Sequence, residues 1–157
     1  DDGPGEPGEL WVRGPQVMQG DLNNEAAIVV TLDADGWLHT GDLATVDASG
    51  IYRIVDRLKE LIKYRGYQVP PAVLEAVLLQ HPDIADAAAI GALDDDGQEF
   101  PKAFVVRRPG SELTGEQVMD FVAERVAPHE KVRAVTFIDA IPKSTSGKIL
   151  RRDLKGR

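Results

Sequence analysis

Three short stretches of the chain carry residue types that can bind or activate a phosphate-containing ligand. The first is Thr40-Gly41-Asp42. A glycine next to a carboxylate can present both carboxylate oxygens to a vicinal diol, such as the 2′ and 3′ hydroxyl groups of a ribose. An aspartate in a turn can instead accept hydrogen bonds from nearby backbone amides. Taken alone, this tripeptide therefore favours an ordinary turn over a ribose site.

The second stretch covers residues 51–69, in which five Lys and Arg residues accompany Asp56 and Glu60. Arg65-Gly66 is predicted to be the turn of a hairpin, because glycine adopts positive φ without steric cost. Five bases beside one hairpin can surround phosphate groups, or they can form a solvated strand face. The stretch is therefore a candidate anion site, and its charge alone does not decide between the two interpretations.

The third stretch is the polar loop 143–148, which superficially resembles a phosphate-binding P-loop. A P-loop requires glycine five residues before the Gly-Lys pair and Ser or Thr directly after it. Pro142 and Ile149 occupy those two places, which excludes a P-loop. What remains is a Ser- and Gly-rich loop that ends in Lys148, a lysine that can be delivered to an anion.

The composition excludes several classes of protein. With 157 residues, the chain can form one domain, or a small domain together with a piece of another. It has no cysteine, which excludes disulfides, thiolate metal sites and a cysteine nucleophile, and which fits a reducing, cytoplasmic compartment. The three histidines are scattered, so we predict no histidine-based metal site. No apolar run approaches the ~20 residues of a membrane helix.

The charge is distributed unevenly along the chain. The net charge of −8 argues against nonspecific binding to nucleic acids or membranes. Residues 1–50 contain ten acidic residues and a single base, whereas residues 141–157 contain six bases and a single acid. This basic end indicates a local partner such as a phosphate or an acidic part of the same protein, although a solvated tail would have the same composition.

The first third of the chain is predicted to form a meander of short antiparallel strands. Strands are expected at 9–13, 37–40 and 51–55, and Gly41-Asp42 is expected to end the second of them. Residues 21–31 are ambiguous, because a helix cap is followed by β-branched residues that prefer strands. The meander has too little apolar surface for its own core, so we expect it to belong to a larger sheet or barrel.

The remainder alternates between helix and strand patterns. Pro70-Pro71 opens one helix, and Thr114 with Gln117 forms the capping box of another. The whole pattern predicts an α+β fold, in which a small C-terminal domain with a three-stranded sheet, helices and a β-hairpin follows an antiparallel β segment of a larger N-terminal domain. Strands are expected at 61–64, 67–69, 84–93, 100–107 and 134–138, with a short helix around 149–154.

The three stretches together are far more specific than any one of them. Thr40-Gly41-Asp42 is followed by Asp56-Arg57-x-Lys59-Glu60-x-Ile62-Lys63-x-x-Gly66-Tyr67-Gln68-Val69 and then by Pro142-Lys143-x-x-x-Gly147-Lys148. In this order and spacing they resemble the adenylate-forming superfamily, which contains acyl-CoA synthetases, luciferase and the adenylation domains of peptide synthetases. Residues 54–64 are most similar to the 4-coumarate–CoA ligase and luciferase branch. The resemblance extends from about Gly8 to Arg152.

The resemblance implies a division of the chain into two parts. Residues 1–58 would be the terminal β-rich part of a large N-terminal domain, Lys59 the hinge, and residues 60–157 a mobile C-terminal domain. Asp42 would hold the ribose hydroxyl groups of the adenylate. Arg57 would bind near the ribose or the phosphate.

The resemblance also implies catalytic roles for Lys148 and Lys59. Lys148 matches the lysine of the first half-reaction, in which the substrate carboxylate attacks the α-phosphate of ATP. After rotation about Lys59, the opposite face of the small domain would line the path of the CoA thiol. That face carries Lys63, Arg65, Gly66 and Tyr67.

The implied activity is ATP-dependent ligation of a carboxylic acid to CoA through an acyl-adenylate. ATP, CoA and the acid would be the small-molecule partners, and Mg²⁺ would be bound mainly by the upstream N-terminal domain, with no metal ligand in this chain. Neither a nucleic-acid partner nor a membrane span is expected. Because the phosphate loop and the acyl pocket lie upstream in this family, we expect the chain to be a fragment that is inactive alone.

Two other functions fit the same residues. One is an enzyme other than a CoA ligase, namely an adenylation domain that loads a carrier protein or an oxidative luciferase-like enzyme. The other is an interaction module without catalysis, which has no need for Lys148, Asp42 and Arg57 together. Four positions depart from the family pattern and weaken the assignment of the substrate more than that of the reaction class: Asp21, Glu25, Pro70 and Val73.

Overall fold

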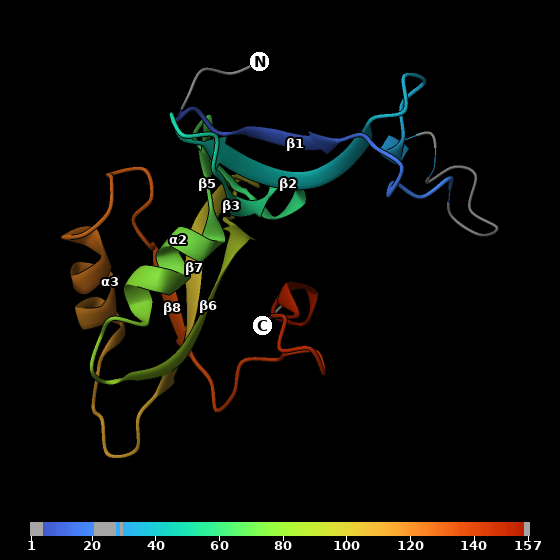
Figure 1. The fold of residues 1–157 in the computed structure, drawn as a ribbon. Coiled ribbons are helices and arrows are strands. Elements are labelled where there is room, and N and C mark those ends of the chain that lie inside the picture. Colours follow the sequence, from blue (N-terminus) through green and yellow to red (C-terminus); the bar gives the residue numbers. More distant parts are fainter. Residues whose placement is uncertain (1–4, 21–27, 29, 156–157) are drawn as a thin grey trace. The chain divides into compact units, whose positions relative to one another are not determined.

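The computed structural model describes residues 5–20, 28 and 30–155 (Figure 1). The chain divides into two compact units, Asp1–Lys59 and Glu60–Arg157. The division falls directly after Lys59, the residue expected to be the hinge. Rotation about this residue stays a prediction. No helix among the described residues is long and apolar enough to cross a membrane.

The first unit contains an antiparallel sheet with the strand order β1-β2-β3. The strands are β1 (Gly8–Val12), β2 (Leu38–Val46) and β3 (Tyr52–Arg57). The predicted antiparallel meander is therefore present. The expected end of the second strand at Gly41-Asp42 is wrong, because β2 continues through these residues to Val46. Gly41 has a φ of 70° and lies where the β1–β2 register shifts, and its amide donates to the Glu9 side chain at Oε1. Pairing with β1 resumes at Leu43.

Two turns of the first unit, Asp33 to Gly36 and Asp47 to Gly50, are held by the side chain of their first aspartate. Asp33 Oδ1 accepts hydrogen bonds from the amides of Asp35 and Trp37, and the bond from Trp37 lowers the pKa of Asp33. Asp47 Oδ1 accepts from the amide and hydroxyl of Ser49, and the hydroxyl bond lowers the pKa of Asp47. A short acceptor side chain that binds the backbone two residues later is the reason why Asp is favoured in such turns.

Residues 21–31 were ambiguous between helix and strand, and the structure shows a helix where it describes them. Val30 and Thr31 are helical, and the Leu32 amide donates to the Ile28 carbonyl at 2.8 Å, which is the spacing of an α-helical bond. The strand preference of β-branched residues is weak enough for the surrounding structure to override it. Residues 21–27, including the helix cap expected there, lie outside the described residues.

The second unit contains a β-hairpin, a three-stranded sheet and two α-helices, as predicted. The sheet has the order β6-β7-β8, with β6 antiparallel and β8 parallel to β7. The short helix expected around 149–154 is a 3₁₀ turn of three residues. The elements are η1 (Leu58–Glu60), β4 (Ile62–Tyr64), β5 (Tyr67–Val69), α2 (Pro71–Leu78), β6 (Ile84–Leu93), β7 (Glu99–Arg107), α3 (Gly115–Ala123), β8 (Ala134–Phe137) and η2 (Arg151–Asp153).

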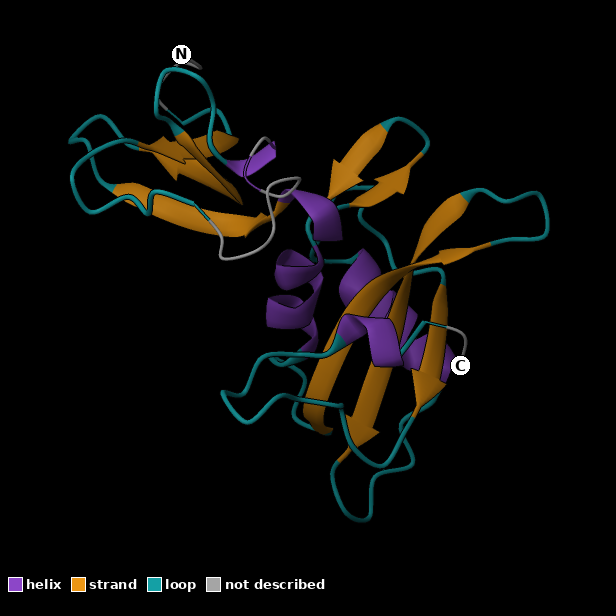
Figure 2. Cartoon of the chain, turned by 90° about the vertical axis from the view of Figure 1, so that its right-hand side faces the viewer, coloured by secondary structure: helices purple, strands orange, loops and turns teal. Residues whose placement is uncertain are grey.

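The sheet of the second unit is covered on both faces (Figure 2). On one face Ala87 and Ala89 of β6 belong to a core cluster with residues of α2 and α3. On the other face Ala88 and Ile90 pack against the C-terminal segment, including the fully buried Leu154. Alternate residues of a strand point to opposite faces, so this one strand contributes to both layers. The C-terminal segment that follows Lys148 is thus part of the core.

The predicted capping box begins α3. The Gln117 amide donates to Thr114 Oγ1, and Gln117 Oε1 accepts from the Thr114 amide. Two amides of the first turn, which have no partner within a helix, are satisfied in this way. The helix then presents the buried residues Val118 and Val122 to the core.

Candidate functional site

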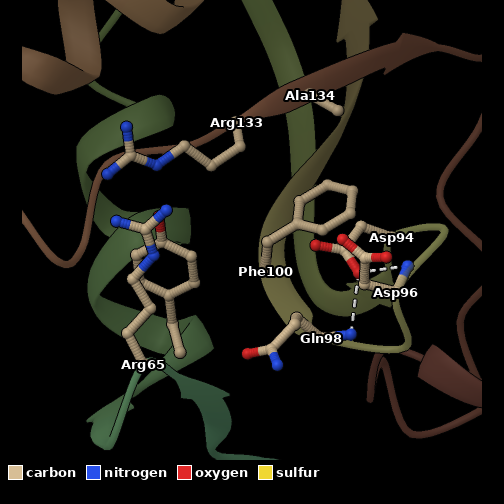
Figure 3. Close-up of a pocket in the computed structure, with 8 residues that line it drawn as sticks. Arg65, Asp94, Asp96, Gln98, Phe100, Arg133 and Ala134 are labelled. Atoms are coloured by element: carbon tan, nitrogen blue, oxygen red, sulfur yellow. Dashed lines mark hydrogen bonds between the residues drawn. The ribbon is translucent and has the colours of Figure 1, made fainter.

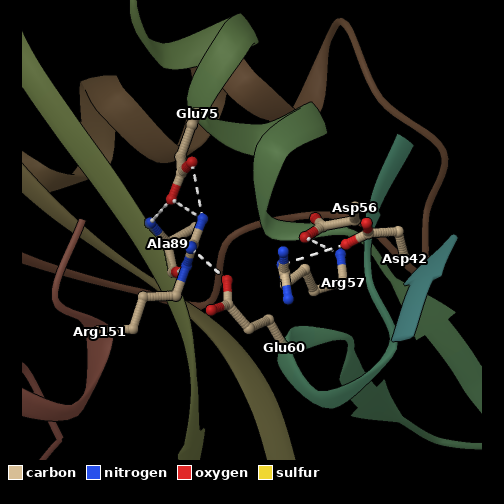
Figure 4. A network of polar contacts seen from close by, with 7 residues as sticks. All are labelled: Asp42, Asp56, Arg57, Glu60, Glu75, Ala89 and Arg151. Carbon is tan, nitrogen blue, oxygen red and sulfur yellow. Dashed lines mark hydrogen bonds and ion pairs between the residues drawn. The ribbon is translucent and has the colours of Figure 1, made fainter. Parts of the chain in front are cut away.

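The first unit brings together the two predicted adenylate-binding residues. Asp42 and Arg57 are directly opposite each other in the β2–β3 pair, and Arg57 Nε lies 3.1 Å from Asp42 Oδ1 (Figure 4). The Asp42 side chain is 23% exposed and that of Arg57 is 58% exposed. The pair therefore combines a carboxylate and a guanidinium group, both accessible to a ligand, at the end of the β2–β3 ladder.

The backbone around Asp42 is fixed by its neighbours. Thr40 Oγ1 donates to the Leu10 carbonyl at 2.7 Å and accepts from the Asp42 amide at 3.1 Å. On the other strand, Asp56 is buried and its Oδ1 accepts from the Arg57 amide at 2.7 Å. Thr40 thus orients the backbone at Asp42, and Asp56 orients the backbone at Arg57. A turn in which Asp42 binds local amides is not what the structure shows.

The hairpin β4–β5 carries the residues predicted to contact CoA. Arg65 and Gly66 have φ values of 49° and 84°, which is the left-handed pair of a tight hairpin turn. Lys63 and Arg65 are exposed. Tyr67 is 55% exposed, and its ring stacks on His129 with 4.2 Å between ring centroids. The hairpin therefore presents cationic groups and an aromatic face to solvent.

A hollow of about 680 Å³ lies beside this hairpin (Figure 3). The guanidinium groups of Arg65 and Arg133 lie 5.3 and 5.2 Å from the centre of the Tyr64 ring, a distance at which a cation is attracted to an aromatic ring. Asp94 and Asp96 line the other side. Two cations held against one ring make this wall of the hollow suited to an anionic group.

The hairpin is attached to the sheet through Glu99 of β7. Glu99 Oε2 accepts from the backbone amide of Lys63 at 2.8 Å. To reach it, the Glu99 side chain crosses Gly91 of β6, and a Cβ atom at Gly91 would lie 1.8 Å from Glu99 Oε1. Glycine at position 91 therefore leaves the space through which Glu99 holds the hairpin.

The loop that carries Lys148 is a closed hairpin. The Ser144 amide donates to the Lys148 carbonyl at 2.8 Å, and the Lys148 amide donates to Ser144 Oγ at 3.1 Å. At the start of the loop, Lys143 Nζ forms an ion pair with Asp86 of β6 at 2.6 Å. The Lys148 side chain is exposed, and its ammonium has no hydrogen bond or ion pair within the described part of the chain. The loop thus holds its backbone and leaves this ammonium available to a ligand.

The candidate site residues lie on different elements. Asp42 and Arg57 form one pair in the first unit, whereas Lys63 to Tyr67 lie on the β4–β5 hairpin and Lys148 on a separate loop of the second unit. Lys59 is exposed in η1, at the boundary between the units. No group of three His, Cys, Asp or Glu side chains able to hold a metal ion is found among the described residues. The arrangement offers two separate cationic surfaces in one small domain.

Sequence patterns did not indicate His129, Arg133 or Glu99 as parts of these surfaces. A lone histidine or arginine far along the chain has no local signal that connects it with a hairpin sixty residues earlier, because only the packed sheet brings them together. Gly91 carried a weak signal, since a glycine inside a strand often marks a close approach.

Three comparisons place the chain among known proteins. Residues 73–148 match the model of the AMP-binding enzyme C-terminal domain. Peroxisomal OPC-8:0-CoA ligase 1 of Arabidopsis thaliana is 55% identical over 152 residues, which are 97% of this chain and 28% of the relative. The chain thus spans about a quarter of the length of the curated relatives that it matches.

Two solved structures share the fold over nearly the whole chain. The structure of o-succinylbenzoate CoA synthetase from Bacillus subtilis, in complex with its acyl-adenylate intermediate, has a TM-score of 0.88 and 35% identity, and covers 99% of this chain and 32% of its own. An amide bond synthetase from Marinactinospora thermotolerans has a TM-score of 0.86 and 33% identity, over 98% of this chain and 31% of its own. Residues 73–148 therefore belong to the family of AMP-binding enzyme C-terminal domains, and nearly the whole chain is similar to the C-terminal part of adenylate-forming CoA ligases.

Proposed function

We propose that the chain is the C-terminal part of an ATP-dependent carboxylic acid–CoA ligase. In the first half-reaction a carboxylate oxygen of the acid attacks the α-phosphorus of ATP, which forms an acyl-adenylate and releases pyrophosphate. In the second, the CoA thiol attacks the acyl carbonyl, which forms a thioester and releases AMP. The observation that carries the proposal is the free ammonium of Lys148 at the end of a closed loop, in a chain of this family.

Lys148 is suited to the first half-reaction. Two anions, the carboxylate and the triphosphate, must approach each other, and a cation placed between them reduces their repulsion and stabilises the charge that develops. A lysine ammonium can act there as a point charge without exchanging a proton. Since the loop backbone is held by Ser144, the approach of Lys148 costs little reordering.

Asp42 and Arg57 are suited to the nucleotide. The carboxylate of Asp42 can accept hydrogen bonds from the two ribose hydroxyls, while Arg57 can pair with a phosphate oxygen. Mg²⁺ accompanies ATP in such reactions, and we expect the upstream N-terminal domain to hold most of its ligands. The described residues offer no cluster of metal ligands.

The hairpin β4–β5 is suited to the second half-reaction. Gly66 leaves the backbone open to a narrow ligand such as the pantetheine arm of CoA, and Lys63 and Arg65 supply positive charge for its phosphates. Rotation of the second unit about Lys59 would present Lys148 and then this hairpin to one active centre. The two cationic surfaces of one small domain would then each serve one half-reaction.

Transfer of the acyl group to an amine is the second candidate, since the amide bond synthetase shares the fold at 33% identity. CoA is favoured because the relatives with 55–57% identity are named as CoA ligases. A carrier protein is a further candidate acceptor. The non-enzymatic alternative is an interaction module without catalysis. We propose a cytoplasmic location, although one relative is named as peroxisomal.

The test is a fusion enzyme in which this chain replaces the matching segment of OPC-8:0-CoA ligase 1. Pyrophosphate release and acyl-CoA formation are measured with ATP, Mg²⁺, CoA and the acid named for that relative. We expect both products from the fusion enzyme, and none from this chain alone or from the relative without its matching segment. A folded fusion enzyme that forms neither product would overturn the proposal. Replacing CoA with an amine or a carrier protein then identifies the acceptor.

A further inference from the structure

Arg151 connects three elements of the second unit. It lies at the start of η2, three residues after Lys148. Its Nε donates to the Ala89 carbonyl at 3.2 Å, and its Nη2 contacts both oxygens of Glu75 at 2.8 and 2.9 Å (Figure 4). Its Nη1 forms an ion pair with Glu60. The Arg151 side chain is only 16% exposed, so this charge is largely withdrawn from solvent.

Arg151 and Glu75 together cover a backbone position at the edge of the sheet. β6 is an edge strand, and an edge leaves amides and carbonyls without partners in the sheet. Glu75 Oε1 accepts from the Ala89 amide at 2.9 Å, while Arg151 donates to the Ala89 carbonyl. The ion pair therefore satisfies both polar groups of one buried residue. This ties the segment after Lys148 to β6 at a defined position.

The segment before Lys148 is tied to the same strand. Lys143 pairs with Asp86 of β6 at 2.6 Å, three residues before Ala89. The Lys148 loop thus leaves β6 at the ion pair of Lys143 with Asp86 and returns to it at the hydrogen bond from Arg151 to the Ala89 carbonyl. Apolar contacts of Ile149 and Leu154 with the sheet support the returning end.

Arg151 also reaches the start of the second unit. Glu60 is the first residue of that unit and directly follows Lys59. The contact between Arg151 and Glu60 therefore joins the residue at the boundary to the segment that carries Lys148. A rigid link of this kind would make the position of Lys148 follow the boundary residue when the unit turns.

We infer that Arg151 is a positioning residue that sets the place of Lys148 in the first half-reaction. The inference rests on the proposed function of Lys148. Arginine is required because its planar group donates in three directions at once, to Glu60, Glu75 and Ala89, whereas a lysine ammonium is a compact point charge on a flexible stem. A purely structural role would affect both half-reactions alike, and a positioning role affects the one that uses Lys148.

The fusion enzyme tests this inference with the variants Arg151→Ala, Arg151→Lys and Glu60→Gln. Arg152→Ala is the matched control, because Arg152 is the next residue, its side chain is 86% exposed, and it pairs only weakly with Asp153 at 3.4 Å. Adenylation is measured as ATP–pyrophosphate exchange. The second half-reaction is measured separately as acyl-CoA formation from synthetic acyl-adenylate and CoA. The midpoint of thermal unfolding is recorded for every variant.

We expect Arg151→Ala to slow adenylation by about 10²-fold, since a displacement of about 1 Å can cost this much, and to change the second half-reaction far less. Arg151→Lys should recover little of the loss. Glu60→Gln leaves the Arg151–Glu75 pair intact, so its unfolding midpoint should not change even if Arg151→Ala fails to fold. Because it weakens the link between Arg151 and the boundary residue, it should still slow adenylation. The control should match the unmodified fusion enzyme.

Two results would separate the inference from the function beneath it. Equal losses in both half-reactions would overturn the positioning role alone. So would Glu60→Gln and Arg151→Ala enzymes that adenylate at the rate of the Arg152→Ala control. Absence of pyrophosphate exchange in the unmodified, folded fusion enzyme would overturn the proposed function itself.

Discussion

Asp42 and Arg57 face each other across two neighbouring strands, with 3.1 Å between Arg57 Nε and Asp42 Oδ1. The contact joins a glycine-containing tripeptide to Arg57 of the basic stretch, which lies fifteen residues after Asp42 in the chain. Because both side chains keep solvent access, the ion pair contributes little to stability. Its oxygen and nitrogen atoms are therefore accessible to a ligand, and the ribose and phosphate roles of the pair stay predictions.

The first prediction concerns Asp42→Asn in the fusion enzyme. Asparagine keeps the shape of the side chain but loses the charge that strengthens hydrogen bonds to ribose hydroxyls, so the KM for ATP should rise by about 10-fold or more. The unfolding midpoint should change little, since exposed pairs contribute about 0–1 kcal/mol. Steady-state kinetics with varied ATP measures the effect.

Asp35→Asn is the control for that substitution, because Asp35 is an exposed turn residue of the same unit. It should leave the KM for ATP unchanged. An Asp42→Asn enzyme with an unchanged KM and a lower unfolding midpoint would mean that the pair is structural.

The second prediction concerns Lys148→Ala. By analogy with the loss of an oxyanion donor, adenylation should fall by about 10²–10³-fold, while acyl-CoA formation from synthetic acyl-adenylate should continue. Stability should not change, because the side chain is exposed and the loop is closed by backbone and Ser144 contacts. ATP–pyrophosphate exchange and a thermal melt measure the two effects.

Lys155→Ala provides the comparison, since Lys155 is an exposed lysine of the same C-terminal segment. Its exchange rate should equal that of the unmodified enzyme. If Lys148→Ala adenylates as fast as Lys155→Ala, the assignment of Lys148 to the first half-reaction is wrong.

Much of the fold could be predicted because local signals agree with it. The strand Ile84–Leu93 and the capping box at Thr114 are present as expected, and Arg65-Gly66 forms the predicted turn. The end of the strand at Gly41 was mispredicted, since Gly41 lies in a register shift that the strand tolerates, where the Glu9 side chain accepts the Gly41 amide. The helix at Thr31 shows that β-branched residues yield to their surroundings.

The support of the candidate site could not be predicted from local patterns. Arg151 appeared as one of several bases in a charged tail, and only the fold shows that it is withdrawn from solvent between Glu60 and Glu75. Glu99 likewise acts through a backbone amide 36 residues away. Such contacts depend on which strands become neighbours, which neither charge nor periodicity specifies.

The third prediction concerns the pKa of Asp47. The Ser49 hydroxyl donates to Asp47 Oδ1 at 2.5 Å and is the largest cause that holds the Asp47 pKa below its ordinary value of 3.8. Ser49→Ala should therefore raise the Asp47 pKa toward that value. A lowered carboxyl pKa stabilises the fold above the ordinary pKa, and this contribution is lost as the pH falls through the folded pKa.

The Asp47 titration is measured by NMR of the side-chain carboxyl carbon, on the 157-residue chain. Asp33 is an internal control, because its lowered pKa depends first on the Trp37 amide and should not respond to Ser49→Ala. An unchanged Asp47 titration in the variant would show that the backbone amides alone hold the carboxylate.

The fourth prediction concerns the attachment of the β4–β5 hairpin. Glu99→Ala removes the acceptor of the Lys63 amide, so the hairpin should shift and acyl-CoA formation from synthetic acyl-adenylate should slow by about 10-fold. Gly91→Ala should act similarly, because its Cβ would occupy the space of Glu99 Oε1 at 1.8 Å and Cγ at 2.7 Å. Adenylation should change less in both variants, since Lys148 lies on another loop.

The double variant provides the decisive measurement for this pair. If Gly91→Ala acts by displacing Glu99, it should add little once Glu99 is alanine, because residues that act through one contact are not additive. The coupling is obtained from acyl-CoA formation rates of the unmodified, single-variant and double-variant fusion enzymes. Fully additive effects would show that Gly91 acts on the sheet itself. A Glu99→Ala enzyme as fast as the unmodified enzyme would show that the Glu99 contact with Lys63 does not hold the hairpin in its working position.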